Sequence, residues 1–192
     1  MIKELFVILF ASAFINNIIL SQFLGLCPLM GTTDKMKSAF RMGPAVIVVI
    51  TLASLFNGLV YHYVLLPLGI VFLQTLVFIV VIIGLVKLIE LIMVKCFDIC
   101  YKSIGLYLPI LITNCVVLGA VLINSRTDFD VLYSTFNGFS FALGFALVLL
   151  ILAGIREKIA LNNVPESFRG LPILLLIAGL MSMAFFGFSL LF

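Results

Sequence analysis

Residues 42–86 read MGPAVIVVITLASLFNGLVYHYVLLPLGIVFLQTLVFIVVIIGLV, a run without a single Asp, Glu, Lys or Arg. As one helix this segment would extend about 68 Å, roughly twice the hydrocarbon thickness of a bilayer. Pro67 and Gly69 interrupt it, and both residues disfavour a continuous helix. The run therefore predicts two membrane-spanning helices that are joined by a short connection near residues 62–66.

The rest of the chain has the same apolar character. Of its 192 residues, 65% are hydrophobic and 10% are charged, and its mean hydropathy is +1.39, which is typical of a multi-pass membrane protein. The other charge-free runs are 5–33, 103–125, 131–155 and 170–192. Each is long enough for one crossing. We therefore expect an all-α membrane protein with six transmembrane helices.

The ends of the predicted helices leave little room for another domain. Residues Ala11-Ser12-Ala13 match a signal-peptidase site superficially, but the apolar run continues past them, which favours a retained first helix. Connections are no longer than about 15 residues, well below the size of a folded domain. Residues 1–192 are therefore predicted to form a single membrane domain, and reactions of soluble substrates would take place on partner proteins.

Basic residues are distributed unevenly between the two sides of the predicted topology. One side carries Lys3 and Arg126, whereas the other carries Lys35, Lys37, Arg41, Lys95, Lys102, Arg156, Lys158 and Arg169, with Lys87 just inside. Because positive charge marks the cytoplasmic side, we expect both termini to lie on the non-cytoplasmic side. The net charge of +3 follows from these loops and gives no reason to expect a nucleic-acid partner.

Two cysteine segments indicate an internal repeat. Cys27 and Cys115 each precede a glycine by four residues, Gly31 and Gly119, and the next span is expected about 17 and 16 residues after them. Three spans in each half make the second half inverted relative to the first, and inverted repeats often place sites at broken helices near the midplane. We predict repeat one at 1–95 and repeat two at 100–192, with helices one and four broken near the cysteines.

The two thiols are expected to meet inside the membrane. Cys115 lies about 16–20 Å from Lys102 and Arg126 along a helix, so it is central. Cys27 reaches a similar depth if Gly25, Pro28 and Gly31 extend the chain. Packing, a disulfide and metal binding are all compatible with such cysteines. An iron–sulfur cluster needs four protein ligands, so a second subunit or copy would supply two of them.

Several segments resemble the A subunits of Rnf complexes, which are membrane-bound ferredoxin:NAD oxidoreductases that pump ions. They are NNIILSQFLGLCPLMG (16–31), LPILITNCVVLG (108–119), GIREKIA (154–160), VPESFRG (164–170) and AGLMSMAFFGFS (178–189). The resemblance extends over nearly the whole chain. The chain is also similar to the E subunit of the sodium-pumping NADH:quinone oxidoreductase. Membership of that group is the alternative to an Rnf A subunit.

The resemblance implies a redox role that composition alone does not give. In that family two paralogous six-helix subunits of opposite topology each contribute two cysteines to one intramembrane [2Fe-2S] cluster. Carried over, Cys27 and Cys115 are the two ligands, and the chain relays electrons across a bacterial or archaeal plasma membrane, coupled to Na⁺ or H⁺ transport. It is then part of an enzyme without a complete active site of its own. The sequence has no nucleotide or phosphate fingerprint, so NAD and flavin are expected on other Rnf subunits.

Other functional classes and other polar residues stay open on sequence alone. A stand-alone inverted-repeat transporter and an assembly scaffold are alternatives to a redox subunit. Cys96 and Cys100 lack a redox or zinc spacing. The remaining polar or small residues each have a structural interpretation beside a functional one: His62, the Lys87/Glu90 pair, Arg156-Glu157-Lys158, the group Asn16, Asn17, Thr113 and Asn114, and the stripe Gly138, Ala142 and Ala146.

Overall fold

The structure is a computed structural model that describes residues 24, 25, 27, 36–69, 71–96, 114–126, 131–160, 162, 165 and 170–189. Within these residues every regular element is a helix. They are α4 (Met36–Val60), η2 (Tyr61–Leu65), α5 (Leu66–Leu68), η3 (Val71–Leu73), α6 (Gln74–Cys96), α9 (Cys115–Arg126), α10 (Val131–Ala160) and α11 (Leu171–Ser189). The segments 36–65, 74–92 and 131–160 are long and apolar enough to cross a membrane. The predicted first span, 5–33, lies outside the described residues except for three positions.

The long apolar run folds into two helices, as its length predicts. The first ends in the π-helix η2 and the short helix α5, where Gly69 adopts the left-handed conformation with φ +66° and donates its N–H to Leu66 O at 3.4 Å. The chain then turns into η3 and α6. A left-handed glycine ends a helix because it carries no Cβ that would clash there. The predicted break is therefore confirmed at Gly69, whereas the prediction of a connection near residues 62–66 is wrong, because the chain stays helical through η2 and α5.

Helix ends and charge boundaries do not coincide. α4 begins at Met36, six residues before the charge-free run, and its Lys37 and Arg41 are exposed. α4 consequently starts nine residues after Cys27, so the predicted spacing of about 17 is wrong, whereas α10 starts 16 residues after Cys115 as predicted. A charge limits the part of a helix that lies in hydrocarbon, but it does not end the hydrogen-bonded helix.

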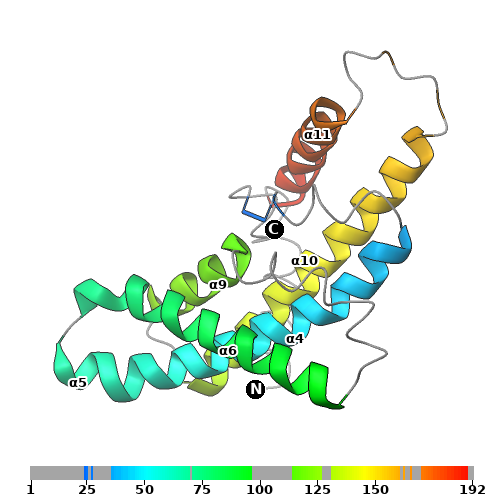
Figure 1. Ribbon diagram of the computed structural model, residues 1–192. Coiled ribbons are helices and arrows are strands. Elements are labelled where there is room, and N and C mark those ends of the chain that lie inside the picture. Colours follow the sequence, from blue (N-terminus) through cyan, green and yellow to red (C-terminus); the bar gives the residue numbers. More distant parts are fainter. Residues whose placement is uncertain are drawn as a thin grey trace.

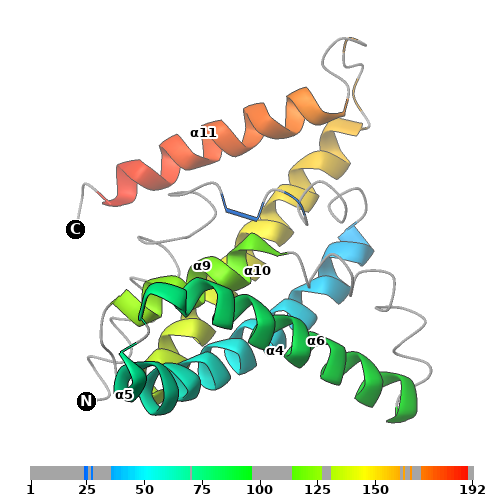
Figure 2. The same ribbon diagram turned by 60° about the vertical axis from the view of Figure 1, so that its left-hand side comes forward.

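The core of the described part is the crossing of α4 and α10, which run antiparallel beside each other (Figures 1 and 2). Their facing side chains include Met42, Val46 and Ile50 from α4 and Phe145 and Leu149 from α10, all of which are buried. α9 packs on this pair, α6 covers α4 and α9, and α11 contacts α10. The two long helices thus form the frame that positions α9.

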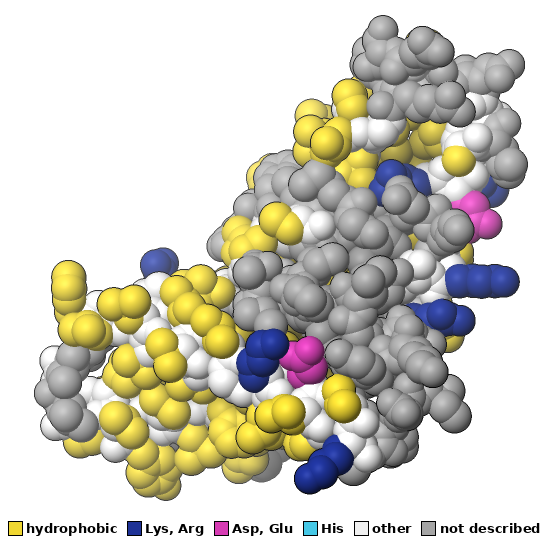
Figure 3. All heavy atoms as spheres, viewed as in Figure 1, with side chains coloured by type: hydrophobic (Ala, Val, Ile, Leu, Met, Phe, Trp, Pro, Cys, Tyr) yellow, Lys and Arg dark blue, Asp and Glu magenta, His cyan; other side chains and the backbone are white. Residues whose placement is uncertain are grey.

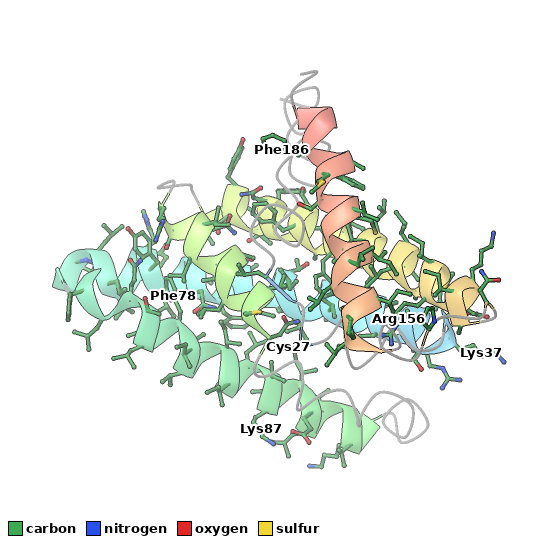
Figure 4. All side chains as sticks on the ribbon, turned by 90° about the horizontal axis from the view of Figure 1, so that it is seen from above. Cys27, Lys37, Phe78, Lys87, Arg156 and Phe186 are labelled. Carbon is green, nitrogen blue, oxygen red and sulfur yellow. The ribbon has the colours of Figure 1, made fainter. Side chains whose placement is uncertain are left out.

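Exposed apolar side chains gather over one part of the described surface. Figure 3 shows hydrophobic side chains over α5 and α6, and Phe72, Leu76, Val80 and Leu91 are among the exposed ones. Lys37 and Arg156 lie at the same end of the bundle (Figure 4), which fits the antiparallel pairing of α4 with α10. An apolar surface of this kind suits contact with lipid or with other membrane subunits.

Candidate functional site

The segment around Cys27 meets the amino-terminal end of α9. The backbone N–H of Gly25 donates a hydrogen bond to Sγ of Cys115, with the two atoms 3.0 Å apart, across 90 residues of sequence. Both ribbon views place residues 24, 25 and 27 near the start of α9 (Figures 1 and 2). The two cysteine segments, which sequence symmetry predicts to approach each other, therefore lie together in the structure.

Both sides of this contact have a glycine where the two segments approach most closely. Gly25 has φ +92°, and a Cβ there would overlap the side chain of Val116 and lie 2.9 Å from Cε2 of Phe145. On the opposing helix, a Cβ at Gly119 would come within 2.5 Å of Cδ2 of Leu24. Such separations are shorter than real carbon contacts allow. Gly119, which the repeat pattern identified, is therefore the point on α9 against which Leu24 of the Cys27 segment packs.

α9 begins at Cys115, and Asn114 caps it. Asn114 Oδ1 accepts the N–H of Val116 at 3.1 Å, and its backbone oxygen accepts the N–H of Val117 at 3.2 Å. Cys115 thus occupies the first helical position, next to the unpaired N–H groups and the partial positive charge of the helix dipole, which interact favourably with an anionic ligand. α9 therefore begins inside the predicted span 103–125, whereas residues 97–113 lie outside the described part, so the break of helix four stays a prediction.

The Asn114 side chain has a second polar atom. Asn114 is 3% exposed, and its Nδ2 has no hydrogen-bond partner among the described residues. The oxygen of this amide is committed to the cap, so its nitrogen is a buried donor without a partner in the described part of the chain, on the residue that precedes Cys115. A buried donor without an acceptor is unfavourable. An acceptor bound beside Cys115 would remove this penalty.

Cys27 lies close to the same position and is exposed. It stands two residues after Gly25, so the Cα atoms of these residues are at most about 7 Å apart, and Figure 4 shows Cys27 beside the first turn of α9. Within the described residues no three His, Cys, Asp or Glu side chains gather into a metal-binding group. This chain consequently offers a pair of thiols, Cys27 exposed and Cys115 half-buried, both free.

The structure also describes several of the other polar and small residues that the sequence analysis considered. Nζ of Lys87 lies 2.8 Å from Oε2 of Glu90, one helical turn along α6, which confirms the structural pair. His62 is exposed and makes an edge-to-face contact with Tyr63. Gly138, Ala142 and Ala146 are all buried, and Gly138 faces Ser54 of α4, so this stripe packs against α4 as expected. Asn16, Asn17, Thr113, Cys100 and the side chain of Cys96 lie outside the described residues.

A second polar region lies at the other end of α9, and sequence reasoning missed it. Asn124 Nδ2 donates to the backbone oxygen of Ser134 at 2.9 Å, and Asn137 Nδ2 donates to Asn124 Oδ1 at 2.8 Å. Asn124 and Ser134 line a small cavity together with Ser54 and Asn57 of α4. The signal that could have found it is a repeated pentapeptide, SLFNG at 54–58 and STFNG at 134–138.

The chain matches the family described as "Rnf-Nqr subunit, membrane protein" over residues 5–192. It belongs to the Rnf-Nqr family. Among curated relatives, the A subunit of the ion-translocating oxidoreductase complex of Pseudoalteromonas atlantica is 45% identical over 186 residues, which is 97% of this chain and 96% of that protein. The A subunit of the Na(+)-translocating ferredoxin:NAD(+) oxidoreductase complex of Acetobacterium woodii is 44% identical over 182 residues, 95% of each chain. The corresponding protein of Actinobacillus pleuropneumoniae serotype 5b is 47% identical over 182 residues, 95% of this chain and 94% of that protein.

Membership of the Rnf-Nqr family agrees with the apolar helices and extends over both cysteine segments. The match covers the residues before α4 as well as the described helices. The resemblance that the segments around Cys27 and Cys115 carry is therefore confirmed at the level of the family, and the chain is membrane-embedded.

Proposed function

We propose that this chain is the A subunit of an ion-translocating ferredoxin:NAD⁺ oxidoreductase complex in a bacterial or archaeal plasma membrane. Relatives that align over nearly their full length carry descriptions of this kind. In the proposal Cys27 and Cys115 supply two of the four thiolates of a [2Fe-2S] cluster, and a paralogous six-helix subunit supplies the other two. The observation that carries the proposal is the hydrogen bond from the Gly25 N–H to Cys115 Sγ.

The residues at this site fit a thiolate-bound iron–sulfur cluster. A cluster with four thiolate ligands is anionic, and negative charge is unfavourable in hydrocarbon unless donors face it. Gly25 N–H, the first turn of α9 and the buried Asn114 Nδ2 are such donors. When bound, the cluster accepts one electron and passes it on. The donors on this chain would stabilise the added negative charge and tune the reduction potential.

The exposure of the thiol pair supports a shared site. Cys27 is exposed and Cys115 is half-buried, and two sulfurs leave a cluster half-ligated. A second subunit that covers Cys27 would complete the ligand set and exclude lipid and water. The chain would therefore contain no iron when it is produced alone.

The packing of α4 and α10 supports the two inverted three-helix repeats. The eighth residue of each helix is a glycine, Gly43 and Gly138, and each faces the middle of the other helix. A Cβ at Gly43 would lie 3.8 Å from Cβ of Ala146, whereas one at Gly138 would overlap the side chain of Ser54. Reciprocal contacts of this kind are those of a two-fold axis between antiparallel helices. Repeats 1–95 and 100–192 would then bring one cysteine each to the axis.

The end of the bundle that carries Lys37 and Arg156 would face the cytoplasm, and both termini would lie on the other side. Ion transport would follow if the redox state of the site biases the two halves between inward-open and outward-open arrangements. Equal accessibility of the ion path in oxidised and reduced complexes would contradict this coupling.

Co-expression tests the proposal. The full chain is purified alone and together with its paralogous partner, and iron and acid-labile sulfide are measured in both samples. We expect iron only in the co-expressed pair, and we expect ferredoxin-dependent NAD⁺ reduction by the whole complex to be lost with Cys115→Ala. Iron in the chain alone would contradict the shared cluster. Unchanged activity with Cys115→Ala would contradict the redox role.

A further inference from the structure

The cavity at the carboxyl-terminal end of α9 offers about 10 Å³ to the centre of a water molecule. It lies between α4, α9, α10 and Phe78 of α6. This volume is at the lower limit for a single water molecule and excludes a hydrated ion. Tyr61 at one side of the cavity begins the π-helix η2, and π-bulges within helices occur frequently at functional sites.

Two side chains at this cavity carry buried oxygen atoms without a partner. Asn57 is fully buried and Ser54 is 1% exposed. Asn57 Oδ1 and Ser54 Oγ have no hydrogen-bond partner among the described residues. The cavity therefore contains an amide oxygen that can only accept and a hydroxyl that can also accept.

The orientation of the amides is fixed by backbone carbonyls. Asn57 Nδ2 donates to Ala53 O at 2.8 Å, and Asn124 Nδ2 donates to Ser134 O at 2.9 Å. An inverted amide would place oxygen against oxygen in both cases, which rules out the alternative assignment. Both side-chain nitrogens thus donate to backbone carbonyls. The side-chain oxygen of Asn57 is the atom that can bind a ligand in the cavity.

The carboxyl-terminal end of α9 makes the cavity favourable for a positively charged ligand. Asn124 and Ser125, in the last turn of α9, line the cavity, and the carboxyl end of a helix carries a partial negative charge. Ser125 Oγ donates to the backbone oxygen of Leu122 at 3.0 Å, which leaves the lone pairs of this hydroxyl for another ligand. Acceptor oxygens, a helix carboxyl end and a small volume together favour a cation over a neutral donor.

We propose that this cavity binds one dehydrated monovalent cation of the size of Na⁺, with Asn57 Oδ1 and Ser54 Oγ among its ligands. The inference deepens the proposed function and rests on it, because an ion-translocating complex requires a site at which the ion sheds its water. The ligands are neutral, so binding is weak enough for release. Hydroxyl and amide oxygens are the ligand type that hard cations take.

Equilibrium binding of ²²Na⁺ to the purified complex tests the site in the absence of electron donors. Asn57→Ala removes the amide oxygen and should raise the sodium Kd at least about tenfold, the effect of losing one buried polar interaction. Asn57→Asp loses the hydrogen bond to Ala53 O but adds a negative charge to the cavity, and because the charge is the larger effect it should lower the Kd by about tenfold at neutral pH. Ser54→Ala should weaken binding in the same direction as Asn57→Ala.

Ser140→Ala is the matched control. Ser140 is a buried serine of α10 that donates to Phe136 O and does not line the cavity. It should leave sodium binding unchanged. Iron content and helical circular dichroism of each variant report whether the complex is intact. Equal sodium binding in wild type, Asn57→Ala and Asn57→Asp would overturn the proposal and identify the cavity as a water site, as would a complex that binds no sodium.

The two proposals fail differently. A complex that binds sodium through Asn57 but does not reduce NAD⁺ with ferredoxin contradicts the proposed function alone. An active, iron-containing complex whose sodium Kd is unchanged by the substitutions at Asn57 and Ser54 contradicts the cation site alone.

Discussion

The two ends of α9 differ in which atoms face the neighbouring segment. At the amino-terminal end the Gly25 N–H and a capped first turn surround the sulfur of Cys115. The other end lies about 14 Å along the helix. There the side-chain nitrogens of Asn57 and Asn124 donate to backbone carbonyls, so the side-chain oxygens of the two residues face the neighbouring segment. Backbone donors favour negative charge, whereas such oxygens favour positive charge. One short helix therefore presents an anion-binding end and a cation-binding end.

The largest change is expected at the thiol end, from Gly25→Ala. The new Cβ would overlap Val116 and crowd Phe145 at a residue with φ +92°, so we expect about 2–4 kcal/mol of destabilisation. Thermal unfolding of the full chain in detergent, followed by circular dichroism, measures it. Gly69→Ala is the control, because Gly69 also has positive φ but nothing within 4 Å of its Cβ position. It should lose only about 1 kcal/mol, and equal losses would show that crowding at Gly25 is unimportant.

A smaller change is expected at the oxygen end, from Asn124→Ala. It removes the donor to Ser134 O and the acceptor of Asn137 Nδ2 inside the bundle, which should lower the free energy of unfolding by about 2 kcal/mol. Combined with Asn137→Ala, the two losses should fall short of additivity by about 1 kcal/mol. Thr135→Val removes a hydroxyl that bonds only within α10 and serves as the reference. Strict additivity of the asparagine pair would contradict the network.

The smallest of these changes is expected from the cap. Asn114→Ala removes the acceptor of the Val116 N–H and should cost about 1 kcal/mol, whereas Asn114→Ser retains a capping oxygen and should lose less. Thermal unfolding of both variants measures the difference. Sodium binding at the far end of α9 should be the same in both. If Asn114→Ala altered the sodium Kd, the two ends would not be independent sites.

The sequence predicts the thiol end better than the oxygen end. Cys27, Cys115 and Gly119 share a short local pattern, and helix breakers such as Pro67 and Gly69 act on their own neighbourhood. The hydrogen bond from the Gly25 N–H to Cys115 Sγ is not part of this local pattern, because the backbone N–H that meets the sulfur depends on how the segment rests on α9. The charge pattern misplaces the start of α4 because Lys37 and Arg41 mark the end of the apolar run and not of the helix.

The oxygen end could not be assembled from local patterns. Asn57 and Ser54 come from α4, Asn124 from α9 and Ser134 from α10. They meet only because α4 and α10 cross antiparallel, which brings SLFNG of one helix against STFNG of the other. Neither pentapeptide differs in composition from ordinary helix-packing sequence. Tertiary arrangement, not residue type, makes the cavity polar.

The most direct measurement is the electron paramagnetic resonance spectrum of the reduced, assembled complex with single cysteine substitutions. The thiol end of α9 requires that Cys27→Ala and Cys115→Ala each abolish the signal of one [2Fe-2S] cluster and the corresponding iron. Cys96→Ala and Cys100→Ala, in the same chain, should leave both unchanged. A full signal and full iron content with Cys115→Ala would contradict the shared cluster.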